Sequence, residues 1–250
     1  MHIWRRGIIK SSIPCGLNGE GAYEAARKER LGNKSFLISL YLVTSRQDAA
    51  QVMASLYAGP AYRGRSDDKI ALEFAVSWNA AAMEDILATL KDKNTRATFV
   101  VSGKWARENA DMLKRIADEG HEIGTMGDDP SFDGNLSETK ADIQKSLESI
   151  KAASGVDTVL YYSGSRSVAV SARASRALGL THVLSTIDLR CGYGSKDDII
   201  KRGLNEPIIG SIILLQPTRA CADALGGLID GLNAKGIIAA RVGDVLGGMV

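Results

Sequence analysis

Residues 96–127 read RATFVVSGKWARENADMLKRIADEGHEIGTMG, and this stretch decides the fold class. Two short β-rich runs frame it, ATFVV from Ala97 and HEIGT from His121, and a helical pattern lies between them. A strand, a helix and a second strand in this order favour parallel pairing of the strands through a right-handed crossover.

The same alternation extends from Lys69 to the end of the chain. Apolar residues recur at i, i+3, i+4 and i+7 over residues 83–90 and again over residues 225–232, as in amphipathic helices. Ser137 with Glu138 opens another predicted helix. The predicted strands are KIALEF, ATFVV, HEIGT, TVLYY, THVLST, SIILL and GIIAA, which begin at Lys69, Ala97, His121, Thr158, Thr181, Ser211 and Gly236.

Seven strand–helix units in a row predict an α/β fold with parallel strands and with chemistry at the C-terminal strand ends. Residues 1–66 follow a different pattern, so they are predicted to be an N-terminal extension whose linker is the segment 58–68, rich in glycine and charge. Residues 67–250 form the predicted main domain.

Composition narrows the function classes. Hydrophobic residues make up 45% of the chain, and 31 Lys and Arg against 29 Asp and Glu leave a net charge of +2. This balance supplies no strong field for nucleic acid or an anionic membrane, so no nucleic-acid partner is expected. The three cysteines, Cys15, Cys191 and Cys221, are too few and too widely spaced for a disulfide framework or a CxxC zinc site.

The apolar run FLISLYLV, residues 36–43, is much shorter than the ~20 residues of a membrane span and is predicted to be a buried strand. It could also pass for the core of a signal peptide, but it begins deep in the chain. The compartment therefore stays open, including the alternative that an export segment belongs upstream of residue 1.

Several segments together resemble the polysaccharide deacetylases of the NodB-homology family. Residues 96–127 are similar to the family pattern KATFFVxGxWxxxNPxLxKxIxxxGHEIGNHS, and the similarity continues in family order through THVLSTIDLR and SIILLQPTRACADALGGLIDGLNAKG to VGDVL. The resemblance implies a distorted (β/α) barrel of about seven strands. Further similarities, in SIPCGLNG, LYAGPAYRG and IALEFAVSWNAAAMEDIL, resemble a diverged, sporulation-associated branch, which implies a cell-envelope or spore-wall location.

The resemblance implies an amide hydrolase whose divalent metal is held by one Asp and two His, with a second Asp as base and a further His as acid. Ala75 and Val76 stand at the two aspartate positions here, and Met126 and Pro130 at the two metal-histidine positions. Gln216 replaces the acid histidine and cannot exchange a proton near neutral pH. No metal or other cofactor, and no family-type catalytic residue, is therefore predicted.

Other side chains keep an alternative open, an active N-acetyl hydrolase with a relocated site. Glu73 could be a general base if burial raised its pKa, or simply an inward polar residue hydrogen-bonded within the barrel. Cys191 beside Asp188 suggests a thiol nucleophile. Asp128 and Asp129 are neighbouring oxygen donors, although adjacent loop acids are usually solvated.

A thiol nucleophile needs a base, and the histidines are His2, His121 and His182. His121 and His182 begin predicted strands, opposite the site end, so both are predicted to be structural.

The leading prediction is a pseudoenzyme that binds a glycan or a protein partner. Aromatic, amide and carboxylate groups suit sugar rings, so the expected ligand is an N-acetylated glycan or peptidoglycan, with a protein partner possible through the N-terminal extension. Tyr161 and Tyr162 could instead plug the vacated cavity. The candidate binding residues are Trp78, Met126, Asp128, Asp129, Tyr161, Tyr162 and Gln216.

Overall fold

The computed structural model describes residues 59–77, 82–205 and 208–247, which belong to one compact unit that begins at Gly59. The predicted strand at residues 36–43, Cys15 and most of the predicted N-terminal extension lie outside the described residues. No helix in the described part of the chain has both the length and the apolar character needed to cross a membrane.

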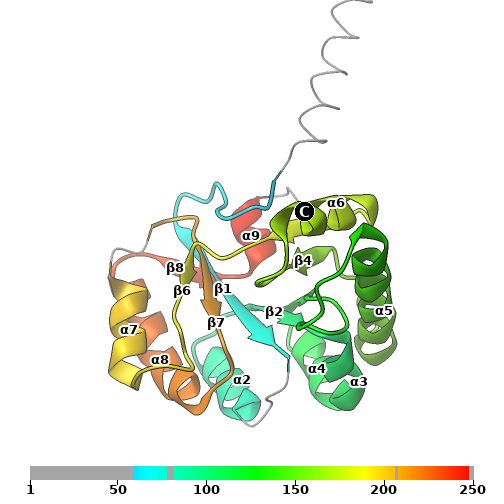
Figure 1. Cartoon of the computed structure of the whole chain (residues 1–250). Coiled ribbons are helices and arrows are strands. Elements are labelled where there is room, and N and C mark those ends of the chain that lie inside the picture. Colours follow the sequence, from blue (N-terminus) through cyan, green and yellow to red (C-terminus); the bar gives the residue numbers. More distant parts are fainter. Residues whose placement is uncertain (1–58, 78–81, 206–207, 248–250) are drawn as a thin grey trace, which may run out of the picture. The chain divides into compact units, whose positions relative to one another are not determined.

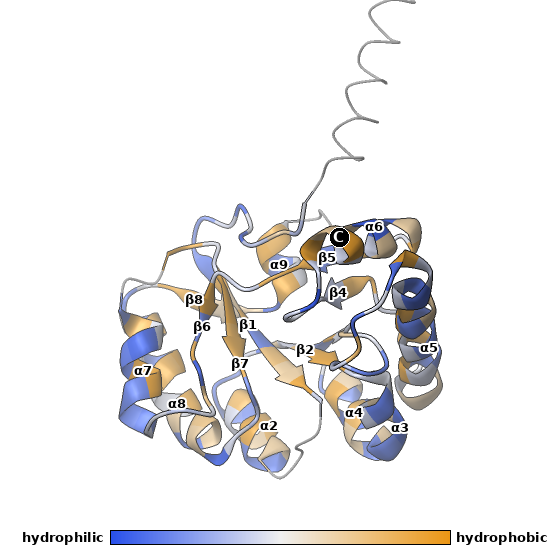
Figure 2. Cartoon of the chain, viewed as in Figure 1, coloured by the Kyte–Doolittle hydropathy of each residue, from blue (hydrophilic) through white to orange (hydrophobic). Residues whose placement is uncertain are grey.

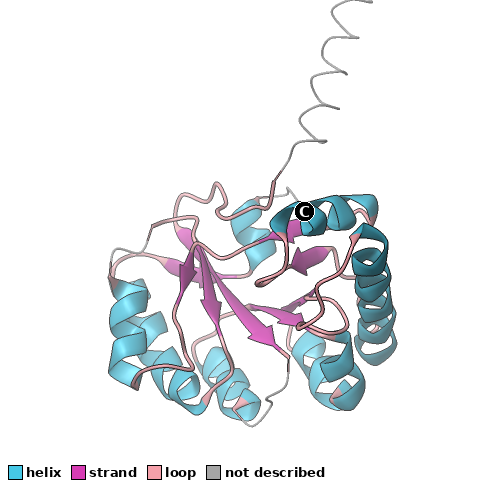
Figure 3. Cartoon of the chain, viewed as in Figure 1, coloured by secondary structure: helices cyan, strands magenta, loops and turns pink. Residues whose placement is uncertain are grey.

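The described residues contain eight strands, all paired in parallel (Figures 1 and 3). Seven of them follow the order β5-β4-β3-β2-β1-β7-β6, and β8 pairs with β1. The sheet curls into the expected distorted barrel, and the seven predicted strands are confirmed. The strands are β1 Lys69–Val76, β2 Thr98–Val101, β3 Glu122–Thr125, β4 Leu160–Tyr162, β5 Thr181–Val183, β6 Ile187–Asp188, β7 Ile212–Leu215 and β8 Ile238–Ala240.

Helices surround this sheet and turn their hydrophilic faces outward, most visibly in α5 and α7 (Figure 2). The helical connections carry the chain back so that the next strand can run parallel, as the strand–helix alternation predicts, whereas only residues 184–186 join β5 to β6. The helices are α2 Met83–Asp92, α3 Gly103–Glu108, α4 Ala110–Asp118, α5 Leu136–Ser154, α6 Val168–Ala177, α7 Lys196–Leu204, α8 Arg219–Ala234 and α9 Val242–Leu246.

The start of α5 corrects one sequence expectation. Asn135, not Ser137, is the N-cap, and its side chain accepts hydrogen bonds from the backbone N–H groups of Ser137 (2.9 Å) and Glu138 (3.2 Å). The Glu138 side chain accepts in return from the Asn135 N–H at 2.9 Å, which completes a capping box. The helix therefore begins earlier than Ser137 indicated.

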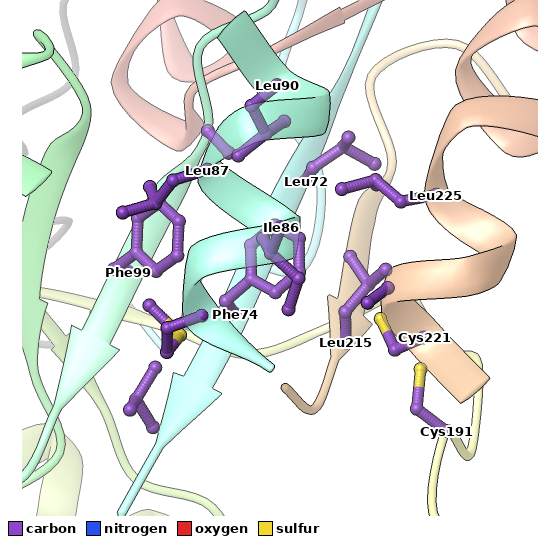
Figure 4. Packing of buried hydrophobic residues seen from close by; sticks show 14 of the residues in the cluster. Leu72, Phe74, Ile86, Leu87, Leu90, Phe99, Cys191, Leu215, Cys221 and Leu225 are labelled. Atoms are coloured by element: carbon purple, nitrogen blue, oxygen red, sulfur yellow. The ribbon is translucent and has the colours of Figure 1, made fainter. Parts of the chain in front are cut away.

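The outer face of the sheet carries the main hydrophobic core. Leu72 and Phe74 of β1 pack with apolar residues of α2 and α8, including Leu87 and Leu225 (Figure 4). Phe74 stacks on Phe99 of β2 with ring centroids 5.0 Å apart. This packing joins β1 and its neighbours to the helices that cover them.

The inner face of the sheet is filled by a second apolar cluster. Ala71, Leu160 and Leu214 from the strands meet Val245 and Leu246 of α9, all of them buried. Small barrels of this kind enclose packed side chains and no pore. The barrel interior is therefore filled and leaves no channel for a ligand.

Residues of the predicted linker pack against the barrel. The Ala61 N–H donates to the His182 carbonyl at 2.8 Å, and the Gly64 N–H donates to the Gly210 carbonyl at 2.8 Å. A Cβ at Gly64 would lie 2.0 Å from the Val245 carbonyl oxygen, so this close approach requires glycine. The domain boundary at residue 66 stays a prediction, although these contacts begin several residues before it.

Candidate functional site

A groove lies at the C-terminal ends of β6 and β7, the end of the barrel where the alternation predicts chemistry. Its volume is about 560 Å³. Asp188 ends β6 and Gln216 directly follows β7, so adjacent parallel strands bring these two predicted site residues together. The lining residues are Asp188, Arg190, Gly192, Tyr193, Gln216 and Thr218.

The groove loop comprises residues 189–195 between β6 and α7. It is anchored by the side chains of Gln216 and Thr218, which follow β7. Gln216 accepts a hydrogen bond from the Cys191 N–H at 2.9 Å, and its amide nitrogen lies 3.4 Å from an oxygen of Asp188. The Thr218 hydroxyl donates to the Cys191 carbonyl at 2.9 Å. Gln216 therefore positions the loop while it faces the groove.

On the other side, α7 holds the same loop. Arg202 donates to the carbonyls of Leu189 (2.9 Å) and Tyr193 (3.0 Å). Arg190 adopts a positive φ of 49°, which is uncommon for a residue with a side chain and occurs often at functional sites. A turn bond of 2.8 Å joins the Tyr193 N–H to the Arg190 carbonyl. The backbone that carries Tyr193 is thereby fixed.

Tyr193 is one of the groove residues that the sequence reasoning missed, as are Arg190 and Thr218. The Tyr193 side chain is 80% exposed, although tyrosine rings usually lose most of their surface in a folded protein. The signal was present in the sequence, as an aromatic residue in the short glycine-rich segment CGYGS between two predicted elements. An exposed ring beside carboxylate, amide and hydroxyl groups can hold the apolar face and the hydroxyls of a sugar.

The loop after β3 differs from the expected binding surface. Met126 is 8% exposed and belongs to the inner apolar cluster, so it is packed under the surface. Asp128 is also buried and pairs with Arg107 at 2.5 Å and Lys145 at 2.6 Å. Asp129 is exposed and accepts hydrogen bonds from the Ser131 N–H (2.9 Å) and hydroxyl (2.6 Å). The carboxylates of Asp128 and Asp129 are therefore both bound by other groups of the protein itself.

The electrostatics of Asp128 agree with this ion-paired role. Burial by itself would raise the pKa of its carboxyl group, but hydrogen bonds from Arg107 and Lys145 outweigh burial and hold the pKa below its usual value. Arg107 and Lys145 thus already neutralise the carboxylate of Asp128.

The side chains present do not fit a divalent metal of the kind the resemblance implies. Ala75, Val76, Met126 and Pro130 offer no oxygen or nitrogen side-chain ligand. Asp128 is occupied by Arg107 and Lys145, and the described residues contain no group of three His, Cys, Asp or Glu side chains that could hold an ion. We derive no catalytic step through a metal.

The two tyrosines of β4 point in opposite directions, which corrects the expectation that both lie at the mouth. Tyr161 is fully buried and packs with Ile143 and Ala174, towards α5 and α6. Tyr162 belongs to the inner cluster and is 8% exposed. Successive strand residues alternate between the two faces of a sheet, so both could not fill one cavity.

Arg166 is a further residue that the sequence reasoning did not single out. It is 5% exposed, donates to the Tyr161 hydroxyl at 3.2 Å and to the Asp129 carbonyl, and pairs with Asp142 at 3.0 Å. This side chain joins the loops after β3 and β4 to α5. It therefore rigidifies the region where the family motif would place its histidines.

Glu73 lies in the middle of β1, below the mouth. Both carboxyl oxygens are buried and have no hydrogen-bond partner among the described residues, which corrects the expectation of an internally hydrogen-bonded residue. Burial, and to a smaller extent the charge of Glu122, raises its pKa to about 8. Because Glu73 does not line the groove, its raised pKa serves no group bound there.

The structure also places Cys191 and the two described histidines, His121 and His182. Cys191 is 2% exposed, and its thiol hydrogen-bonds the thiol of Cys221, not a base. The described histidines are structural, as predicted, because His121 accepts from the Ala97 N–H at 3.2 Å and His182 lies 2.9 Å from the Ser163 hydroxyl. Trp78 lies outside the described residues.

Comparison with known proteins agrees with the observed fold. Residues 63–183 match the family model for polysaccharide deacetylase. This segment belongs to the polysaccharide deacetylase family. The solved structure of wild-type BA3943, described as a CE4 family pseudoenzyme from Bacillus anthracis, has a TM-score of 0.71 and 25% identity over 75% of this chain and 68% of that chain. The Bc1960 peptidoglycan N-acetylglucosamine deacetylase shares the fold, with a TM-score of 0.68 and 24% identity over 75% of this chain and 92% of its own.

Two curated relatives also match parts of the chain. The chain is 29% identical over 215 residues to the uncharacterized protein YlxY of Bacillus subtilis, which covers 82% of this chain and 66% of YlxY. It is 27% identical over 92 residues to the peptidoglycan-N-acetylglucosamine deacetylase PgdA of Listeria monocytogenes, which covers 37% of this chain and 20% of PgdA. The chain therefore spans only part of the length of either relative.

Proposed function

We propose that this protein is a polysaccharide deacetylase-fold protein without deacetylase activity that binds an N-acetylated glycan of the cell wall or spore wall in the groove at β6 and β7. The observation that carries the proposal is the exposed ring of Tyr193 beside Asp188 and Gln216, on a loop held rigid by Arg202 and Thr218. A ring fixed before binding loses little conformational freedom when a sugar stacks on it.

The absence of suitable ligands at positions 75, 76, 126 and 130 supports the non-catalytic part of the proposal. The resemblance implies that a bound metal activates water for attack on the acetamide, and these four side chains cannot hold one. The similarity to BA3943, described as a pseudoenzyme, is consistent with a fold that persists after catalysis is lost. The similarity to PgdA supports peptidoglycan as the glycan class.

Binding is tested by titrating the protein with chitin oligosaccharides and soluble peptidoglycan fragments in a calorimeter. Tyr193→Ala should weaken binding about tenfold, roughly 1.4 kcal/mol, because the stacking ring is lost. Tyr62→Ala is the matched control, since Tyr62 is 49% exposed and does not line the groove. Equal affinities for the wild type and Tyr193→Ala, or no binding at all, would refute a glycan site in this groove.

A separate assay tests the loss of catalysis. Protein incubated with Zn²⁺ or Co²⁺ and acetylated chitin oligomers should release no acetate above the protein-free blank, because no described group of side chains can hold the ion. Metal-dependent acetate release would overturn the non-catalytic assignment without affecting the binding test.

A relocated hydrolase site receives no support from the geometry. Glu73 is enclosed in the barrel, Asp128 is ion-paired and Cys191 contacts a second thiol. Only Asp188 among the alternative's residues lines the groove. A protein partner for the N-terminal extension stays a proposal, as does an envelope location.

A further inference from the structure

Two cysteines meet beneath the groove. Cys191 lies in the groove loop and Cys221 in the first turn of α8, and their side chains lie next to one another (Figure 4). The two thiols hydrogen-bond to each other and are only 2% and 0% exposed, respectively. Their separation in the sequence hides this contact, which neither the family resemblance nor the proposed function uses.

The backbone around both cysteines is fixed by one side chain. The Thr218 hydroxyl donates to the Cys191 carbonyl at 2.9 Å and accepts from the Cys221 N–H at 3.2 Å. Gln216 adds the 2.9 Å bond to the Cys191 N–H. These hydrogen bonds hold the backbones of both cysteines in place, and a disulfide forms only between cysteines that are held close together.

The two thiols are not equivalent. The hydrogen bond from Cys221 lowers the pKa of Cys191 despite its burial. The same bond and burial raise the pKa of Cys221 well above its usual value. Because the thiolate is the nucleophile in disulfide exchange, Cys191 is the sulfur that reacts first. Cys191 also lies in the groove loop, between the groove-lining residues Arg190 and Gly192.

We propose that Cys191 and Cys221 are a redox-active pair that a low-molecular-weight disulfide converts into an intrachain disulfide, tying the groove loop to α8. The Cys191 thiolate attacks one sulfur of the oxidant, forms a mixed disulfide and expels one thiolate. Cys221 loses its proton to water and attacks the Cys191 sulfur, which releases the second thiol. The protein gives up two electrons and two protons, and the oxidant is reduced to two thiols.

The bond would have a direct consequence for the groove. The loop that carries Tyr193 is held to α8 by hydrogen bonds of Thr218 and would then be held covalently as well. Oxidation should reduce opening of the groove loop, and an effect on glycan affinity follows only if the proposed glycan function holds. Disulfide formation itself is measured without a glycan, so failure of one proposal leaves the other testable.

The experiment uses the full chain with Cys15→Ser, which leaves Cys191 and Cys221 as the only thiols. Native protein is incubated with oxidised glutathione, blocked with a thiol reagent, and digested with trypsin without reduction. The expected product is a covalent link between peptides 191–196 and 220–235, which mass spectrometry detects and a reductant removes. Oxidation should also raise the urea midpoint of unfolding, because the crosslink restricts the unfolded chain.

Two controls complete the design. Cys191→Ala and Cys221→Ala, each in the Cys15→Ser background, should show neither the linked peptides nor the rise in midpoint. Two unmodified thiols in the native protein, a stable glutathione adduct on Cys191, or a disulfide between two chains would each overturn the proposal. The test on the parent protein requires no substitution in the core, so poor folding of the Cys221 variant leaves it decisive.

Discussion

Glu73 is a buried side chain whose protonation makes the stability of the barrel depend on pH. Its pKa is raised to about 8 from 4.5, chiefly by burial and then by Glu122. Between these pH values the folded protein keeps a proton that the unfolded chain releases. The contribution of Glu73 to the free energy of unfolding must therefore fall as pH rises, by roughly 1.4 kcal/mol per pH unit, until Glu73 ionises in the folded state.

Substitution of this carboxyl group tests the argument. Glu73→Gln removes the titration, so its stability relative to the wild type should increase between pH 5 and pH 8, by on the order of 2–4 kcal/mol. Urea unfolding at both pH values measures the change. Glu148→Gln, at an exposed position, is the control and should leave the pH dependence unchanged. The same pH slope in Glu73→Gln and wild type would contradict a buried, protonated Glu73.

At the scale of elements, α5 illustrates how a helix start is selected. Three polar residues in the segment NLSE, Asn135, Ser137 and Glu138, compete for the cap, and the free backbone N–H groups are satisfied from Asn135. Side-chain oxygens at the N-cap stabilise a helix because the first backbone donors have no partner within it.

Two substitutions separate these roles. Asn135→Ala should destabilise the protein by about 1 kcal/mol, because the bonds to the N–H groups of Ser137 and Glu138 are lost. Ser137→Ala, at an exposed position, should change stability by less than about 0.5 kcal/mol. Urea unfolding of the two variants provides the measurement. If Ser137→Ala were the more damaging change, the helix would begin at Ser137 in solution.

At the scale of the molecule, apolar packing and ion pairs hold the described domain together. Apolar side chains fill both faces of the sheet, and ion pairs of Asp128 and Arg166 tie the loops where the family's metal would sit. We therefore expect the stability of the fold to be independent of the ion that the family resemblance implies.

Thermal unfolding tests this independence. A metal present at a hundredfold excess over its Kd would stabilise the folded state by about 2.7 kcal/mol and raise Tm by several degrees. We expect the same Tm in EDTA and in excess Zn²⁺, within about 1 °C. A metal-dependent deacetylase of the family, measured in parallel, provides the positive control. A zinc-dependent rise of several degrees would reveal a specific site.

Much of the fold could be predicted because it depends on local pattern. Apolar runs such as residues 69–74 are buried strands wherever they pair, and apolar spacing over residues 83–90 makes a helix face before any partner is known. The replacement of Asp and His at positions 75, 76, 126 and 130 is inferred from the order of motifs in the resemblance and stays a prediction. These features can be predicted because each depends on residues that lie close together in the chain.

The amino-acid sequence alone determined the strand–helix alternation, the family resemblance and the missing ligand side chains. Only the tertiary structure decided that Tyr161 turns outward and Tyr162 inward, that Asp128 is paired with Arg107, and that Cys191 meets Cys221. Even β6 has two residues and becomes a strand only because it pairs with β7. All of these features depend on contacts between segments that are distant in the sequence. The physical reason is that a local sequence pattern does not determine which distant side chain will lie opposite a given residue.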